Sequence, residues 1–416
     1  MATSSEVVIT GLGPVSPIGI GREAFSESLR ARTSGVDIVD RFVECGRPVQ
    51  IGAALKDFQP KLYVKPRKSL KVMSHEIQMG VASATLAVED AELKVDEIDV
   101  DRMGVVYGSP MLYADVSELT DLFLGCMVDG KFDFDRFGGQ FPKQMIPLWM
   151  LKYLPNMTAS HIGIAHGARG ANNSVVEGDL SSLLAMIEAA SVIERGLADV
   201  MLTGGSGSRL CLTSVTYRGD SNLSHRNDAP TAASRPFELE RDGMVLGEGA
   251  GTIVLESRAH AERRGAPILG TVVSYARTHA GRDLNRGLTS AIKRSIVRCL
   301  EKGEVSPAEI GQVNAHGLSE LQHDQWEADA IRDVLPDVPV TAVKSYFGNV
   351  GAASGALELS ASLMSESVLP TLNYDKPDPA CDINVSSNAR LAGAGMLLKL
   401  NQNATGQAAA MLIRRE

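Results

Sequence analysis

The sequence predicts an α/β fold built from two similar α/β halves that pack together as one unit. Strand-like runs alternate with helix-like segments along both halves of the 416 residues, an order typical of α/β proteins. The composition agrees, with 44% hydrophobic residues, 40 glycines and 5% aromatic residues, since small residues let helices approach sheets closely. No Ser/Gly-rich or Pro-rich linker divides the chain, so we expect one compact body.

The first element is a predicted strand at residues 7–10, which closes on Gly11, Leu12 and Gly13 and is followed by a loop. Glycines after an opening strand occur in dinucleotide-binding folds. Here the third glycine is missing and Pro14 interrupts the turn, so we reject a nucleotide site and expect no cofactor.

Two helices are predicted next, at residues 22–31 and 73–93. In the second helix, Ile77, Val81 and Val88 share one face, and core packing is the expected role of that face.

A strand predicted at residues 104–108 is followed by an insertion at about 113–165. Its central part, residues 115–155, is rich in Phe, Met and Leu and has few regular signals. We interpret such an excursion between two strands as a partner interface or a pocket wall. Further strands are predicted at residues 198–203 and 252–256.

The second half repeats the alternation. A charged helix at residues 257–264 precedes a strand at 268–275 and a helix at 287–302, and the final strand follows a glycine-bearing turn at 404–406. We place the two halves at residues 1–257 and 258–416.

Charge and cysteine usage exclude several classes of function. The net charge is -9 and no long basic run is present, which argues against a nucleic-acid surface. The five cysteines are scattered without paired spacing, so we expect neither disulfides nor a metal site. No apolar run reaches membrane-spanning length and no basic, then apolar, leader is present, so we expect a cytoplasmic protein.

The most informative stretch is N-N-S-V-V-E-G-D-L-S-S at residues 172–182. A strand-like run leads into Leu180, Leu183 and Ile187 at helical spacing, which places Asp179 at a strand-to-helix turn. Free N–H groups and the positive dipole end make such a turn a suitable place for a nucleophile. The residue here is aspartate.

Several longer motifs carry a resemblance to a known family. They are V-V-I-T-G-L-G-P-V-S-P-I-G (7–19), A-D-V-M-L-T-G-G (198–205), R-P-F-E-L-E-R-D-G-M-V-L-G-E-G-A-G (235–251), V-N-A-H-G-L-S (313–319) and K-S-Y-F-G-N (344–349). Together, in this order, they resemble β-ketoacyl-acyl-carrier-protein synthases of the elongating type. The resemblance implies a thiolase-like fold, a five-layered αβαβα sandwich of two related halves. It also implies a dimer and an acyl-carrier-protein partner.

The resemblance further implies a catalytic cysteine, two histidines, a lysine and a glutamate. His316, Lys344 and Glu327 match the first histidine, the lysine and the glutamate, whereas Asn349 stands at the second histidine and Asp179 at the cysteine. The family's glycine-phenylalanine gate loop, F-G-F-G-G, is matched by Q-N-A-T-G at residues 402–406, so the gating aromatic is absent.

Structural roles compete with catalytic ones at these positions. Asp179 suits a helix cap or a salt bridge, and we expect it to pair with His316 or Lys344. His316 is either catalytic or a retained scaffold element. Asn349 cannot titrate near neutrality and is given no acid or base role. No cysteine occupies a matching turn, so we do not expect a relocated thiol nucleophile.

Three functions follow from this pattern. The leading hypothesis is a ketosynthase-like protein that no longer condenses and that pairs, as chain-length-factor subunits do, with an active ketosynthase. Those subunits typically carry Gln at the cysteine position, so Asp179 departs from their pattern. A malonyl-carrier-protein decarboxylase, or an unusual acyltransferase using His316 and Lys344, is the second. A homodimeric acyl-binding or carrier-binding scaffold is the third.

Overall fold

The computed structural model describes residues 5–281, 284–391 and 395–416. The strands are β1 (Val7–Ser16), β2 (Gly19–Ile20), β3 (Asp37–Ile38), β4 (Ile51–Gly52), β5 (Met103–Gly108), β6 (Met127–Val128), β7 (Lys131–Phe132), β8 (Asn172–Val175), β9 (Val200–Ser208), β10 (Glu248–Ser257), β11 (Gly270–His279), β12 (Ile310–Asn314), β13 (Val340–Thr341), β14 (Ser367–Val368), β15 (Arg390–Leu391), β16 (Met396–Gln402) and β17 (Gln407–Arg415). The α-helices are α1 (Arg22–Arg30), α2 (Asp40–Glu44), α3 (His75–Asp90), α4 (Val116–Gly125), α5 (Phe137–Gln144), α6 (Met157–His166), α7 (Ser181–Glu194), α8 (Leu212–Arg218), α9 (Arg258–Arg264), α10 (Leu284–Gly303), α11 (Leu321–Val334), α12 (Lys344–Phe347) and α13 (Ser354–Leu363).

Two sets of strands, one from each half of the chain, build the central sheet. The path runs β13-β12-β16-β17-β11-β1-β10-β9-β5-β8, and β1 meets β11 over only the residues Val7 to Ile9. Counted outward from this junction, the first half contributes β1, β10, β9, β5 and β8, and the second half contributes β11, β17, β16, β12 and β13. In each half these are the first, fifth, fourth, second and third of its five strands on this path, numbered in chain order. Both sets are antiparallel near the junction and parallel at the outer edge. The two halves therefore share one topology.

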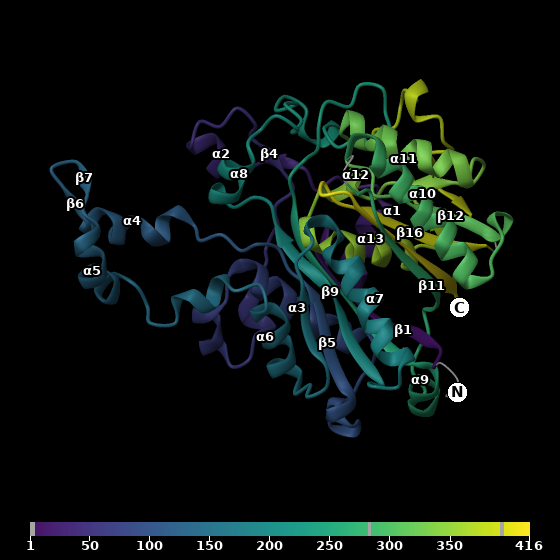
Figure 1. The fold of residues 1–416 in the computed structure, drawn as a ribbon, viewed down its shortest axis with the longest axis horizontal. Helices are drawn as coiled ribbons and strands as arrows, with labels where there is room; N and C mark the ends of the chain where they lie inside the picture. The colour runs from purple at the N-terminus through teal and green to yellow at the C-terminus, as the bar shows by residue number, and fades with distance from the viewer. Residues whose placement is uncertain (1–4, 282–283, 392–394) are drawn as a thin grey trace.

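Helices cover the strand sets in layers, as Figure 1 shows. Helices α3 and α6 lie on the outer face of the first set, and α10 and α11 cover the second set. Helices α7 and α13 contact each other and strands of both sets, so they form the middle layer. Apolar side chains of α7 such as Leu183 and Met186 pack there with Leu255 of β10 and Met411 of β17. The predicted thiolase-like, five-layered α/β fold is confirmed.

Strand β1 is longer than the sequence indicated. Residues 11–16, expected as a glycine loop, continue the strand and pair with β10. A Cβ on Gly11 would lie 2.4 Å from the Ala87 carbonyl oxygen, and a Cβ on Gly13 would lie 2.0 Å from that of Ser83. Both glycines therefore allow α3 to pack directly on the strand, and they have no phosphate-binding role.

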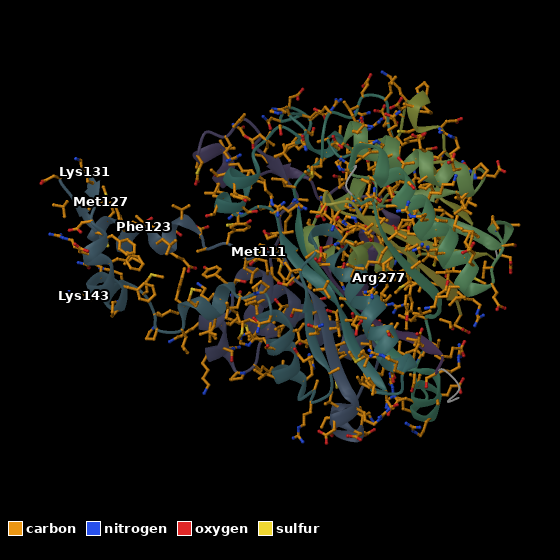
Figure 2. The ribbon with its side chains drawn as sticks, viewed as in Figure 1. Met111, Phe123, Met127, Lys131, Lys143 and Arg277 are labelled. Atoms are coloured by element: carbon orange, nitrogen blue, oxygen red, sulfur yellow. The ribbon has the colours of Figure 1, made fainter. Side chains whose placement is uncertain are left out.

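The insertion predicted in the first half forms an arm, defined here as residues 111–156, that projects from the body (Figure 1). Helices α4 and α5 enclose a small core of Leu122, Cys126 and Met145. Figure 2 labels Phe123, Met127, Lys131 and Lys143 on its outer part. The sequence did not predict these short helices, since the apolar pattern of the segment is divided between the small core and an exposed surface.

Within the described part of the chain, no helix is both long and apolar enough to cross a membrane.

Candidate active site

Asp179 lies in a single 3-10 turn, Gly178–Leu180, between β8 and α7. Gly178 has φ of +59°, a conformation that favours glycine. The Ser181 hydroxyl closes the turn by donating to the Gly178 carbonyl oxygen (2.7 Å) and accepting the Glu177 N–H (2.8 Å). Asp179 therefore does not act as the helix cap. Its carboxylate is free to turn inward.

The carboxylate of Asp179 is buried among groups from distant parts of the chain. Arg209, one residue beyond β9, donates a guanidinium N–H to Oδ1, and both side chains are about one-tenth exposed. The Asn349 amide nitrogen donates to Oδ2 at 2.9 Å. His316 Nε2 lies 3.8 Å from the same oxygen. The expected proximity of Asp179 and His316 is present, but the principal cation is Arg209, which the sequence did not indicate.

Asp179 is an anion throughout the physiological range. Burial alone would raise the pKa of its carboxyl group. The charge of Arg209 and the hydrogen bond from the Asn349 amide outweigh burial and hold the pKa of Asp179 well below its ordinary value. The nucleophile turn therefore carries a permanent negative charge.

His316 is fully buried two residues beyond β12, and its hydrogen bonds fix its tautomer. The Lys344 ammonium (2.9 Å) and the Asn401 amide nitrogen (2.8 Å) both face Nδ1. Because both groups are donors, Nδ1 accepts, and the ring proton lies on Nε2, which faces Asp179. Burial first, and then the charge of Lys344, hold the pKa of His316 well below its ordinary value. The ring is a neutral N–H donor.

Lys344 belongs to a buried charge network that the sequence analysis missed. Its Nζ also donates to the His316 carbonyl oxygen at 2.8 Å and to Glu358 Oε1 at 2.5 Å. The other oxygen of Glu358 accepts from Lys399 Nζ at 2.6 Å. Burial lowers the pKa of Lys399 to about 8. Glu358 therefore binds two lysines, and one of them orients His316.

Glu327 supports the loop that carries His316. Its two carboxylate oxygens accept the backbone N–H groups of His316 (2.7 Å) and Gly317 (2.8 Å). Burial raises the pKa of Glu327 to about 7. The carboxylate that contacts Lys344 is Glu358, so Glu327 acts on the backbone rather than on the lysine.

Asn349 is held by both backbone and side-chain bonds. Its N–H donates to the Val245 carbonyl oxygen (2.8 Å), and its own carbonyl accepts from Gly247 (3.0 Å). Its side-chain oxygen accepts from the Gly351 N–H at 3.0 Å, which leaves the amide nitrogen for Asp179. Two N–H donors, Asn349 Nδ2 and His316 Nε2, therefore face one carboxylate oxygen.

The segment 402–406 joins β16 to β17 beside these residues. The Asn403 side chain stabilises the turn by accepting from Thr405 and Gln407 and by donating to the Glu177 carbonyl oxygen at 3.1 Å. A fixed hydrogen-bonded turn thus stands where the resemblance implies a gate.

Two cavities meet at Asp179. An outer cavity of about 240 Å³ is lined by Asp179, Arg209, Val215, Arg218, Gly219, Ser221, Asn222, Leu223, Met244, Leu246, His316, Leu318, Glu320, His323, Gln402, Asn403 and Ala404. A second cavity of about 150 Å³ extends past Pro110, Met111 and Val176 at the base of the arm. Asp179, Arg209 and Arg218 line both cavities, so they form the wall between them.

None of the five cysteines lines either cavity at Asp179. Cys126 lies in the arm core, and Cys45 is exposed. Burial raises the pKa of Cys299 to about 11 and that of Cys381 to about 12. Among the described residues, no cluster of His, Cys, Asp and Glu is arranged to hold a metal ion.

The missed residues left only weak signals in the sequence. Lys399 interrupts the apolar run M-L-L-K-L, and Glu358 interrupts a helix of small and apolar residues. Charged residues in such positions indicate a buried ionic partner. Arg209 offers no comparable signal, because it follows the glycine-rich end of β9, and its partner is known only from the fold.

Comparison with known proteins agrees with this architecture. Residues 4–261 match the N-terminal domain of β-ketoacyl synthases and residues 269–375 match the C-terminal domain. The chain is 32% identical to 3-oxoacyl-[acyl-carrier-protein] synthase 2 of Coxiella burnetii, over 92% of this chain and 91% of that protein. It is 31% identical to the protein of the same name from Synechocystis sp., over 91% of this chain and 90% of that protein.

A solved structure is also similar. It is described as a type II PKS acyl-carrier protein in complex with its ketosynthase bound to the hexaketide, and it matches at 28% identity with a TM-score of 0.85. The match covers 99% of this chain and 100% of that one. The chain therefore belongs to the β-ketoacyl synthase family, the condensing-enzyme family of fatty-acid and polyketide synthesis.

Proposed function

We propose that this chain is a condensation-inactive ketosynthase-family subunit that pairs with an active β-ketoacyl synthase, in the manner of a chain-length factor. One observation carries the proposal. The Asp179 carboxylate stands at the nucleophile turn, is ion-paired with Arg209, and occupies the point on which the N–H donors of His316 and Asn349 converge.

This arrangement opposes both halves of a condensation reaction. Acyl transfer in the family uses a cysteine thiolate and N–H donors that stabilise a developing oxyanion. A carboxylate does not carry an acyl chain as a thioester does. Here the N–H donors already face the negative charge of Asp179, so a substrate oxyanion would meet a like charge at a few ångströms.

The geometry favours the decarboxylase alternative less. Lys344 is among the residues that orient His316 and bind Glu358, and it is absent from the residues lining the outer cavity. A malonyl carboxylate entering that cavity would meet the charge of Asp179 beside Arg209. We therefore assign Lys344 a positioning role and His316 a donor role.

The arm supports the proposal of a partner subunit. Its exposed side chains include Phe134, 76% exposed, and Leu124, 64% exposed. The other exposed apolar residues of the arm are Met111, Val116, Phe123, Met127, Phe132, Ile146, Leu148 and Met150. A projecting element with so much exposed apolar surface is typical of a protein interface. We assign this surface to the partner ketosynthase, with an acyl carrier protein as the shared substrate carrier and the cytoplasm as the compartment.

The first test measures chemistry at Asp179. Purified wild type, Asp179→Cys and Asp179→Ala are incubated with acyl carrier protein bearing a hexanoyl or malonyl group, and intact-protein and carrier masses are recorded. We expect no acyl adduct and no decarboxylation with wild type or Asp179→Ala. Asp179→Cys is expected to gain the acyl mass, because a thiol beside Arg209 has a lowered pKa. Acyl loading or malonyl decarboxylation by wild type would refute the proposal.

The second test concerns the partner. The tagged chain is isolated from its own cells and its assembly is measured by native mass spectrometry. We expect a one-to-one complex with a cysteine-bearing ketosynthase. The Leu124→Ser/Phe134→Ser variant is expected to lose that partner, whereas Lys131→Ser, on the same arm, is expected to retain it. A homodimer without that subunit would instead support the scaffold hypothesis, and turnover by a homodimer would support the enzyme hypothesis.

A further inference from the structure

Gln402 is a buried polar side chain in the wall of the outer cavity. It is the last residue of β16 and is 1% exposed. Within the described part of the chain, neither its amide nitrogen nor its amide oxygen has a hydrogen-bond partner. Almost all buried polar groups in proteins are paired, because an unpaired one loses its hydration without compensation. A side chain that lacks both partners within the protein and lines a cavity is available to a polar group of a ligand.

The rest of the outer cavity limits what that ligand can be. Its apolar lining residues are Val215, Leu223, Met244, Leu246, Leu318 and Ala404. Asp179 is paired with Arg209, and Glu320 is paired with His323, so these charges are compensated within the protein. Arg218 is the remaining cation of the lining, and it lies on the wall shared with the other cavity, among residues that line both. A mostly apolar ligand with an uncharged oxygen near Gln402 fits the apolar part of this lining. The Asp179–Arg209 wall between the cavities limits its length.

We propose that the outer cavity binds a short acyl chain that carries a hydroxyl or keto oxygen, and that the Gln402 carboxamide recognises this oxygen. A keto oxygen would accept from the amide nitrogen, and a hydroxyl group would donate to the amide oxygen. A saturated chain would leave both amide atoms unpaired and would therefore bind more weakly. This inference rests on the proposed function, because it assigns non-covalent acyl binding to the same site.

The test uses two soluble thioesters that differ by one oxygen: hexanoyl-N-acetylcysteamine and 3-hydroxyhexanoyl-N-acetylcysteamine. Their dissociation constants are measured by isothermal titration calorimetry with wild type, Gln402→Leu and Gln402→Met. Gln59→Leu, which changes an exposed glutamine outside the cavity, is the matched control. Two apolar variants are used so that a folding defect in one, detected by circular dichroism, leaves the other available.

We expect wild type and Gln59→Leu to bind the hydroxylated thioester about tenfold more tightly than the saturated one. The Gln402 variants should lose this preference and bind the saturated thioester more tightly than wild type does. Equal binding of the two thioesters by wild type, an unchanged preference in both Gln402 variants, or no binding of either thioester would overturn the inference. The proposed function is tested separately, because acyl loading is read as a covalent mass change that the affinity ratio does not affect.

Discussion

Replacement of Arg209 by methionine tests the account of the site most directly. The change keeps much of the side-chain volume but leaves the Asp179 carboxylate, about nine-tenths buried, without its cation. Removing one partner of a buried ion pair costs about 3–5 kcal/mol. We expect the lower end, about 3 kcal/mol, because the Asn349 amide still donates to Asp179.

A double-mutant cycle separates the ion pair from other effects of the substitution. Asp179→Asn leaves Arg209 unpaired beside Arg218 and is expected to cost about 2 kcal/mol, whereas the double variant, with neither charge, is also expected to cost only about 2 kcal/mol. The resulting coupling energy is about 3 kcal/mol, at the upper end for residues in direct contact. Free energies of unfolding are obtained from urea titrations followed by intrinsic fluorescence.

The pH dependence supplies the second readout. In wild type the pKa of Asp179 is depressed, so its contribution to stability is present above its unfolded pKa and lost as the pH falls through the folded value. In Arg209→Met burial raises the Asp179 pKa, so that variant gains stability relative to wild type as the pH is lowered from 7.5 to 5. A cost below about 1 kcal/mol, or a deficit that does not shrink at pH 5, would refute the assignment of this pair.

Three further predictions concern the supporting residues. The pKa of Lys399 is lowered to about 8, so between pH 8 and 10.5 the unfolded chain binds this proton more tightly than the folded protein does. The free energy of unfolding of wild type should therefore rise by up to about 3 kcal/mol relative to that of Lys399→Met over this pH range. A pH-independent difference in urea titrations would contradict this. Gly13→Ala should destabilise the fold by about 3 kcal/mol, measured by thermal unfolding, because its Cβ would overlap the Ser83 carbonyl. The control Gly138→Ala, which has open space around it in α5, should be neutral or slightly stabilising in that assay. Glu327→Gln should cost about 2 kcal/mol in chemical denaturation, since one amide oxygen cannot accept both N–H groups that the carboxylate binds; an unchanged midpoint would exclude the role of Glu327 in holding the His316 loop.

Much of the fold was predictable because its signals are local. Residues 22–31 and 73–93 were predicted as helices and form α1 and α3, and the alternation in both halves corresponds to strand sets of one topology. The bounds of β1 were wrong because glycine, which reads as a loop in sequence, serves there to bring α3 close to the strand. The small helices of the arm were missed because some of their apolar residues pack in the arm's core and others are exposed, so they give no single apolar helix face.

The site was only partly predictable, because its contacts join distant segments. Asp179, His316 and Asn349 lie together as their motif positions suggested. Arg209 was missed because the pairing of β9 with β5, and the placement of α7 beside both strands, decide what the end of β9 faces. The sequence did not identify Glu358 as the partner of Lys344, because Glu327 and Glu358 are both acidic residues on helices near histidine or lysine motifs, and only the fold distinguishes them.

The ion pair at the nucleophile turn has a further implication for how the family scaffold is used. A buried salt bridge is weak support for stability, since burying two charges costs nearly as much as their attraction returns. Apolar residues of similar volume would fill the wall between the two cavities at least as well. What Asp179 and Arg209 supply instead is a carboxylate that faces two N–H groups, one of them within hydrogen-bond distance, and a charged wall that both cavities share. Both effects act on ligands, which is consistent with a subunit that holds an acyl group without reacting with it.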